Sequence, residues 1–336
     1  MNGKILVTGA GGYIGSVALY SLLKKGYKVI ALDNFSTGYQ QPLEIMQKRF
    51  GAKSLKIYKK DLRGSLDRIF RRGDIETVIH YAGSCNADES VQNPDKYYDN
   101  NVLTTLNLVN TMMKYDVQNI ICSSTCDIYG NAQYLPVDEK HAISPGNPYG
   151  ISKRIAEKFI EYQGGLKKIN YLIFRYFNVT GASEDGLFGD SKKASSLLVQ
   201  NAVRGALNIQ PFYVTCPKVK TPDKTPISDF INVVDLADAH IKGIEYLNNG
   251  GKSEVLNLGT GTGNSVLEVI QTVQNMTSAK YEITYSPKPK LGEYVKMISS
   301  VKKARKVLDW TPKRKIDHSI ESLLSWYKAR PNGWEY

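Results

Sequence analysis

The sequence predicts an α/β fold in which helices cover both faces of a doubly wound parallel sheet, with a smaller α/β C-terminal domain. Strand and helix signals alternate through the first half of the chain, as such a sheet requires. A glycine-rich turn joins the first strand to the first helix near the N-terminus. The 336 residues, 42% of them hydrophobic, suffice for one large domain and one smaller domain.

The first strand, turn and helix form a nucleotide-binding pattern. Lys4–Thr8 is a short apolar run typical of a buried parallel strand, and residues 9–15 supply the turn before an apolar helix over 17–23. The glycines let a pyrophosphate approach the backbone at the helix N-terminus. A second strand over 27–32 ends in Asp33, whose carboxylate accepts hydrogen bonds from ribose hydroxyls and repels a 2′-phosphate. This order predicts a Rossmann domain that prefers NAD to NADP.

The rest of the first half continues the alternation of strands and helices. Asp61 follows the next strand, where a carboxylate can meet the adenine amino group. Tyr81, Ala82 and Gly83 follow the fourth strand, where small residues let a cofactor lie against the backbone. We expect strands over 55–59, 77–80, 119–123 and 171–174, and helices over 42–50, 66–71, 94–115 and 148–162.

The second half of the chain is less regular. Residues 183–193 are polar and contain glycine, which predicts a mobile loop, and the proline-rich run 216–226 predicts an exposed loop. We place an NAD-binding domain at 1–178, with its sheet completed by about 228–262, and a substrate-binding domain at 179–227 and 263–336. We expect helices over 195–207, 234–247, 266–276 and 316–328, and strands over 229–233 and at the start of 256–263.

Composition and charge exclude several classes of protein. No stretch approaches the ~20 apolar residues of a membrane span, and the first strand begins too early to leave room for a signal peptide. The net charge is +12, with lysines and arginines crowded between residues 288 and 315, but no stacking aromatics alternate with them, so we expect no nucleic-acid partner. The four cysteines, Cys85, Cys122, Cys126 and Cys216, form no metal-binding or disulfide pattern, which favours a cytoplasmic protein without a metal site.

Tyr149 and Lys153 form a dyad on the helix predicted over 148–162. Residues four apart share one face of a helix. An ammonium beside a phenol favours the ionised phenol, so this spacing predicts a tyrosine that acts as a base below its free pKa of about 10.

The chain resembles the extended short-chain dehydrogenase/reductase family and, within it, the UDP-glucose 4-epimerases. The resemblance extends nearly from end to end, and its specific pieces are the runs at 7–16, 32–34, 97–102, 175–178, 234–238 and 257–261. The run Cys122–Thr125 ahead of Tyr129-Gly130 is similar to the segment that carries the catalytic serine or threonine of that family, and Thr125 falls on its position.

The resemblance implies a mechanism and a set of site residues. Tyr149 would take the proton of a sugar hydroxyl, Lys153 would hold the nicotinamide ribose and lower the phenol pKa, and Thr125 would share the hydrogen bond to that hydroxyl. NAD would take the hydride and return it to the other face of a 4-keto sugar. The implied cofactor-binding residues are Gly9, Gly12, Tyr13, Ile14, Asp33, Asn34, Asp61, Leu62, Tyr81, Ala82, Gly83, Asn100, Ser123, Tyr149, Lys153 and Tyr176. The implied substrate-binding positions are Asn178, Ser196, Leu197, Tyr213, Ser228, Lys290 and Glu293, with Asp127 beside them.

The sequence departs from the epimerase pattern at the phosphate-binding positions. Ser228 and Lys290 stand where that family has arginines, and neither reproduces the bidentate fork of a guanidinium. Cys85 and Ser196 replace a lysine and an asparagine of the pattern. Three explanations stay open: the lysines at 218, 220 and 224 supply the charge, the nucleotide sugar is not a UDP-hexose, or the protein is not an epimerase.

Asp127 is a further departure. It lies two residues past Thr125, where related nucleotide-sugar 4,6-dehydratases carry a glutamate that removes a proton from carbon 5. The resemblance as a whole leads us to expect a 4-epimerase of UDP-hexoses. Asp127 keeps a dehydratase or related nucleotide-sugar enzyme as one alternative, and a non-catalytic NAD-binding regulator is the other. By analogy with the family, the helices over 94–115 and 148–162 would form a homodimer interface.

Overall fold

A computed structural model describes residues 3–191, 196–281, 283–286 and 294–335. Its centre is a seven-stranded sheet in the order β3-β2-β1-β4-β5-β6-β11, and every neighbouring pair is parallel. The order reverses between β1 and β4, which is where a doubly wound sheet opens a ligand crevice at its carboxyl edge. The predicted fold class is confirmed. The strands are β1 (Lys4–Thr8), β2 (Val29–Asp33), β3 (Leu55–Lys59), β4 (Ile75–His80), β5 (Asn119–Thr125), β6 (Asn170–Tyr176) and β11 (Glu254–Leu258).

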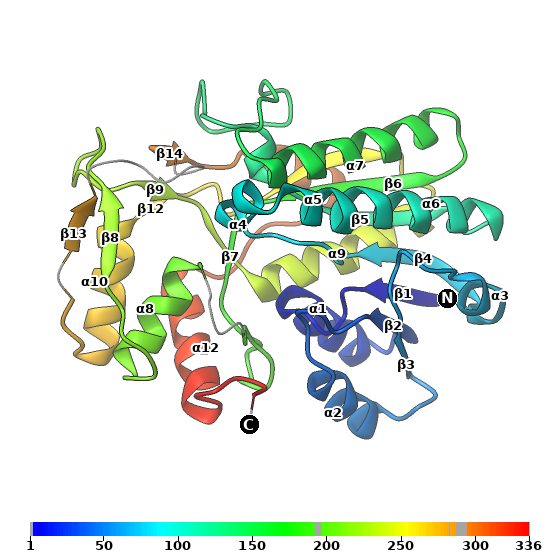
Figure 1. The fold of residues 1–336 in the computed structure, drawn as a ribbon, viewed down its shortest axis with the longest axis horizontal. Coiled ribbons are helices and arrows are strands. Elements are labelled where there is room, and N and C mark those ends of the chain that lie inside the picture. The colour runs from blue at the N-terminus through cyan, green and yellow to red at the C-terminus, as the bar shows by residue number, and fades with distance from the viewer. Residues whose placement is uncertain (1–2, 192–195, 282, 287–293, 336) are drawn as a thin grey trace.

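Helices cover both faces of this sheet, and each face has its own hydrophobic core (Figure 1). One face packs against α1 (Tyr13–Lys24), α2 (Gln41–Phe50) and α9 (Val233–Asn248), and the other against α3 (Asp67–Gly73), α6 (Thr104–Lys114) and α7 (Pro148–Gly165). The strand residues between these layers are apolar on both sides, since Leu6 and Val7 are neighbours and both are fully buried. The alternation of strands and helices in the sequence therefore correctly predicts a sheet between two layers of helices.

The helix predicted over 94–115 begins and ends near the expected residues but is not uniform. It consists of α5 (Pro94–Tyr97), a π-helical stretch η1 (Tyr98–Leu103) and α6, and a short helix α4 (Ala87–Gln92) precedes it. The π-helical stretch places Asn100 at the cavity described below and turns Asn101 inward, where its amide bonds the backbone of Ser84 and the hydroxyl of Ser152. Wide turns of this kind are frequent at functional sites.

The C-terminal part forms a smaller α/β unit beside the carboxyl edge of the sheet (Figure 1). Its helices α8 (Leu198–Ala206), α10 (Val266–Thr277) and α12 (Ile316–Ala329) pack on one another. The helix α11 (Lys302–Leu308) instead packs on β11 and α9. The remaining short elements are β7 (Asn178–Thr180), β8 (Val214–Pro217), β9 (Ile227–Ser228), β10 (Phe230–Asn232), β12 (Asn264–Ser265), β13 (Ile283–Ser286), β14 (Lys296–Met297) and the 3-10 turn η2 (Cys126–Ile128). The residue boundaries of the two domains stay a prediction.

Two predicted loops are more ordered than expected. In the first, the Ser183 hydroxyl accepts the backbone N–H groups of Leu187 and Phe188, and Phe188 is buried, so this part of the segment packs against the protein. Residues 192 and 193 of the predicted loop lie outside the described residues, and its mobility stays a prediction. In the second, Cys216 belongs to β8 and Thr225 is fully buried, so this run is not simply exposed. Parallel pairing of β8 with β13, distant in sequence, provides order that local composition does not reveal. Within the described residues, no helix has the length and apolarity needed to cross a membrane.

Candidate active site

A cavity of about 530 Å³ lies at the carboxyl edge of the sheet, where the C-terminal unit faces it. The structure brings every predicted catalytic and cofactor-binding residue into its lining, together with Asp127, Asn178, Ser196 and Leu197. These residues come from segments spread over more than half of the chain. Their convergence at the point where the strand order reverses is what a nucleotide-binding site on this fold requires.

The turn between β1 and α1 forms the phosphate end of this cavity. Gly9 has a φ of +67°, and a Cβ atom there would lie 2.6 Å from the backbone nitrogen of Ala82. Gly12 caps α1 without any side-chain hydrogen bond, and a Cβ atom on it would meet only the Gly9 carbonyl, at 3.3 Å. In the part of the chain that the structure describes, no side chain caps the first N–H groups of α1, and these residues line the cavity. A pyrophosphate fits this cradle, because its oxygens would accept those donors at the positive end of the helix.

Acidic side chains line the part of the cavity beyond β2 and β3. The Asp33 carboxylate accepts the backbone N–H of Gly11 at 2.9 Å and that of Phe35 at 2.7 Å, so it also holds the glycine turn in place. Asn34 donates to Asp61 at 2.9 Å, and Arg63 bonds both oxygens of Asp61. Arg63 holds the pKa of Asp61 well below its usual range, whereas burial raises that of Asp33. These carboxylates suit the ribose and adenine ends of NAD.

The catalytic candidates meet where β5 ends and α7 begins. Asn147 caps α7 by accepting the N–H of Gly150 at 2.8 Å, and Pro148 starts the helix, so the first turn that carries Tyr149 is well fixed. Tyr149 and Thr125 both line the cavity, and the Thr125 hydroxyl acts to lower the pKa of the Tyr149 phenol. One turn further on, the Lys153 ammonium lies 3.4 Å from the Ser123 hydroxyl. A sugar hydroxyl placed beside Thr125 would therefore touch a base and a second hydrogen-bonding partner.

The pKa of Tyr149 departs from the prediction. Burial raises it well above the usual value of 10, and the nearby Cys85 and Asp127 raise it further, while the Thr125 hydroxyl acts in the opposite direction. The expectation that Lys153 holds this pKa low is therefore not met, because Lys153 is not among the groups that set it. The physical reason is that burial in an apolar cavity disfavours a phenolate.

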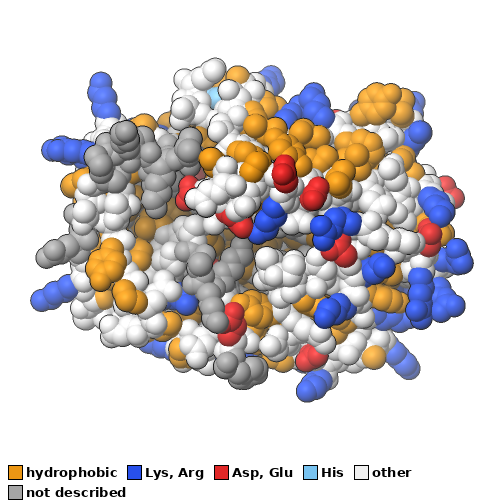
Figure 2. Space-filling model, in the orientation of Figure 1, with side chains coloured by type: hydrophobic (Ala, Val, Ile, Leu, Met, Phe, Trp, Pro, Cys, Tyr) orange, Lys and Arg blue, Asp and Glu red, His pale blue; other side chains and the backbone are white. Residues whose placement is uncertain are grey.

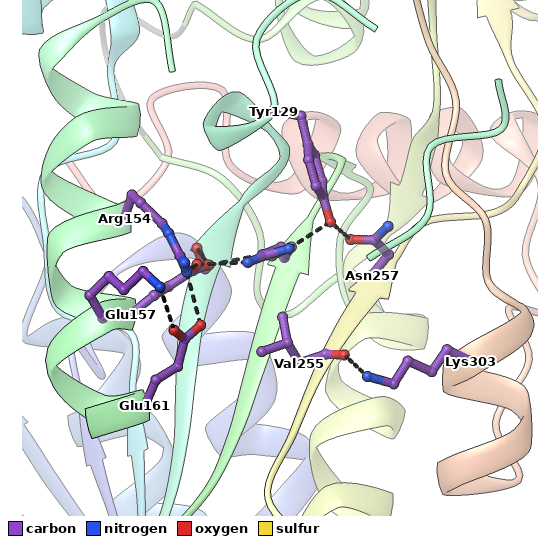
Figure 3. A network of polar contacts seen from close by, with 10 residues as sticks. Tyr129, Arg154, Glu157, Glu161, Val255, Asn257 and Lys303 are labelled. Atoms are coloured by element: carbon purple, nitrogen blue, oxygen red, sulfur yellow. Dashed lines mark hydrogen bonds and ion pairs between the residues drawn. The ribbon is translucent and has the colours of Figure 1, made fainter. Parts of the chain in front are cut away.

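A buried polar network joins α7 to the sheet one turn beyond Lys153 (Figure 3). Glu157 on α7 is bound bidentately by Arg175 of β6, at 3.0 and 2.8 Å, and it also accepts the hydroxyl of Ser124 at 2.5 Å. Arg154 adds an ion pair to Glu157 at 2.7 Å. On its other side, Arg175 donates to the Tyr129 hydroxyl, which in turn bonds Asn257 of β11. The network ties α7 to three strands of the sheet.

Sequence reasoning missed residues that close the cavity from the C-terminal side. Trp334 and Ser191 line the cavity together with Tyr39 from the loop after β2. The Tyr39 hydroxyl lies within hydrogen-bond distance of the Ser191 carbonyl, at 3.1 Å, and of the Glu335 carboxylate, at 2.9 Å. The backbone N–H of Trp334 donates to the Ser191 hydroxyl. These three segments are separated by about 140 residues or more, so no local signal in the sequence connects them.

Some predicted substrate residues lie elsewhere. Tyr213 is 82% exposed at the start of β8 and does not line the cavity, because the pairing of β8 with β13 directs this segment to the outside. Ser228 is paired with Asn264 and Met297 in the small sheet and is likewise absent from the lining. The structure therefore does not bring these two residues to the site. Lys290 and Glu293 lie outside the described residues.

Comparisons with known proteins agree with this geometry. Residues 5–259 match the model of the NAD dependent epimerase/dehydratase family. The UDP-glucose 4-epimerase of Rhizobium meliloti is 34% identical over 335 residues, which cover 99% of each chain. UDP-arabinose 4-epimerase 1 of Arabidopsis thaliana is 34% identical over 340 residues, covering 98% of this chain and 80% of that one.

Solved structures give the same result. UDP-glucose 4-epimerase from Bifidobacterium longum, in complex with NAD+ and UDP, superposes with a TM-score of 0.91 at 34% identity, covering 98% of this chain and 100% of that one. The UDP-Glc/GlcNAc 4-epimerase from Campylobacter jejuni gives a TM-score of 0.84 at 32% identity, with coverage of 98% and 100%. The resemblance stated from the sequence is confirmed. Because the family model spans most of the chain and these relatives match it nearly from end to end, the chain belongs to the NAD-dependent epimerase/dehydratase family.

Proposed function

We propose that this protein is an NAD-dependent 4-epimerase of UDP-hexoses. The observation that carries the proposal is that Thr125, Tyr149 and Lys153 converge in the same cavity as the N-terminus of α1. Relatives that match the chain over 98% of its length or more are named UDP-glucose 4-epimerase. NAD, the cofactor of the family, would supply the chemistry by taking a hydride from carbon 4 of the sugar and returning it to the opposite face.

The residues of the chain would perform the proton transfer and the positioning. Tyr149 would remove the proton of the 4-hydroxyl and return it, which typically contributes a factor of about 10²–10⁴ to the rate. Thr125 would share that hydrogen bond and fix the hydroxyl against the phenol. Lys153, buried beside Ser123, would hold a ribose hydroxyl of the cofactor and offset the negative charge of the phenolate.

The substrate side of the cavity supports a nucleotide sugar without fixing the base or the sugar. Asn178 and Leu197 line the cavity as the family resemblance implies, and Ser196 lies there in place of an asparagine. We propose that UDP is the nucleotide, because relatives with bound UDP share the fold along nearly the whole chain. Lys218, Lys220 and Lys224 remain candidates for the charge that Ser228 does not supply.

The test is incubation with UDP-galactose and then with UDP-N-acetylgalactosamine, followed by proton NMR of the products. The gluco isomer is the expected product. A 4-keto-6-deoxy product would replace the proposal with a dehydratase, and absence of turnover by protein that retains NAD would favour a different nucleotide sugar or a regulator. A Tyr149→Phe variant that keeps its NAD and its full rate would contradict the assigned base.

We further propose a cytoplasmic homodimer. Hydrophobic side chains gather over α5, α6 and α7 on the face seen in Figure 2. Exposed apolar residues belong to the same region, with Leu103 51% exposed, Ile155 42% and Tyr162 65%. Contiguous apolar surface of this kind is typical of an interface. None of the four cysteines forms a disulfide, which supports a reducing compartment. Light scattering of the purified protein tests the dimer.

A further inference from the structure

Asp127 places a carboxyl group in the sugar part of the cavity. It belongs to the short turn η2, directly after β5, and its backbone N–H donates to the Thr125 hydroxyl at 3.2 Å. Asp127, Thr125 and Tyr149 all line the cavity. The negative charge of Asp127 acts on the Tyr149 hydroxyl strongly enough to raise its pKa. The carboxyl therefore lies close to the atoms that would handle the reacting carbon.

Among the described residues, the surroundings of this carboxyl contain hydrogen-bond donors but no cation that lowers its pKa. The Tyr294 hydroxyl and the Asn147 amide hold the pKa of Asp127 down, but burial outweighs them and raises it to about 6. Cys126 and Tyr149 are the other titratable groups that face it, from η2 and α7. Within the described residues Asp127 forms no ion pair. At neutral pH the side chain is thus an unpaired negative charge enclosed by protein and accessible from the cavity.

We infer that Asp127 determines which sugars the site accepts: it binds a hydroxyl next to the reacting carbon and excludes sugars that carry a carboxylate. This inference rests on the proposed epimerase function, because it places the sugar between Tyr149 and Asp127. A carboxylate has free lone pairs that accept hydrogen bonds from sugar hydroxyls. A uronate carboxylate would instead meet a like charge in an enclosed site where few solvent molecules screen it. Selection would come from repulsion of the wrong sugar as well as attraction of the right one.

The test compares UDP-galactose with UDP-galacturonate on NAD-bound protein. We expect kcat/KM for the uronate to be at least about 100-fold lower in the wild type, since like-charge contacts of this kind are strongly unfavourable. Asp127→Asn keeps the shape and one acceptor oxygen but removes the charge, so it should reduce this discrimination at least about 10-fold. Asp138→Asn is the matched control, because Asp138 carries the same charge outside the cavity lining and bonds Tyr134 instead.

A second variant separates charge from hydrogen bonding. Tyr294→Phe removes a donor to Asp127 and leaves the carboxylate in place, so discrimination against the uronate should persist. The inference is overturned if the wild type handles both sugars within about 10-fold, if folded Asp127→Asn keeps the wild-type ratio, or if Tyr294→Phe shifts the ratio as much as Asp127→Asn does. Calorimetry measures the ratio of the dissociation constants of UDP-glucose and UDP-glucuronate, which reports the same discrimination at the level of binding, without turnover. Absence of epimerisation would thus count against the proposed function alone, while the binding ratio still decides the role of Asp127.

Discussion

The buried pair Glu157–Arg175 should be the most sensitive polar contact in the protein. Both side chains are almost completely buried, at 1% and 3% exposed, and the pair is bidentate. Glu157→Leu would leave the Arg175 guanidinium without its carboxylate and the Ser124 hydroxyl without an acceptor. Removing one partner of such a pair typically costs about 3–5 kcal/mol, because the remaining charge stays buried and uncompensated. We expect a loss of that size in the free energy of unfolding.

Glu161→Leu is the matched control for this experiment. Glu161 lies one turn further along α7 and pairs with Arg154 and Lys158, but it is 24% exposed. Its loss should cost less than about 1 kcal/mol, as partly exposed pairs usually do. Urea unfolding at saturating NAD, followed by circular dichroism, measures both variants under the same conditions.

The double variant Arg175→Met/Glu157→Leu tests the physical reasoning directly. Replacing both charges by apolar groups removes the uncompensated charge, so the double variant should be more stable than Glu157→Leu alone. The reasoning is refuted if Glu157→Leu costs no more than Glu161→Leu, or if the second substitution adds a further large loss. Burial would raise the pKa of Glu157, but the bonds from Arg175, Ser124 and Arg154 outweigh it and lower the pKa. The contribution of the pair should therefore be present above the unfolded pKa and lost as the pH falls through the folded one.

Three further predictions follow from the cavity. Because burial raises the folded pKa of Asp127 to about 6, ionisation of this carboxyl destabilises the fold as the pH rises toward and past that value. Asp127→Asn should therefore be more stable than the wild type by up to about 3 kcal/mol at pH 8. Urea unfolding of both proteins at pH 5 and pH 8 should show that this difference in stability is smaller at pH 5. Asp33→Asn removes the charge that repels a 2′-phosphate, so fluorescence titration should show the preference for NAD over NADP reduced by about 10-fold or more, and an unchanged ratio would contradict this role. Tyr39→Phe breaks the bonds to Ser191 and Glu335, so NAD should be released several-fold faster from this variant. Gel filtration with absorbance detection measures the release, and Tyr162→Phe, on the exposed face of α7, should leave its rate unchanged.

The first half of the fold could be predicted because its strands and helices carry local signals. Strands of a doubly wound sheet are buried on both faces and appear as apolar runs, and glycine at positive φ marks the turn at Gly9. Helix α4 was missed although a signal exists, since the Asn86 side chain caps it by accepting the N–H of Glu89. Helix α11 lies in the basic stretch between residues 288 and 315, for which the sequence analysis predicts no element boundaries.

The parts that could not be predicted depend on contacts between distant residues. The strands β9, β12 and β14 have two residues each, too few for any periodicity, and exist only because they pair with one another. Tyr39 bonds Glu335 near the opposite end of the chain, and Trp334 bonds Ser191 in its middle. The pKa of Tyr149 was predicted in the wrong direction because spacing shows the neighbouring lysine but not the burial or the charge of Asp127.

The contacts between β5 and α7 explain why the catalytic residues occupy these positions. Tyr149, Lys153 and Glu157 follow one another at intervals of four along one face of α7. Each lies near one of three consecutive residues of β5: Tyr149 lines the cavity with Thr125, Lys153 approaches Ser123, and Glu157 accepts from Ser124. Because Glu157 is also held by Arg175 of β6, the third contact anchors the helix on the sheet, and the first two then define where Tyr149 and Lys153 point. A change of register between helix and strand would break all three contacts at once, so the position of the base follows from the packing of the fold.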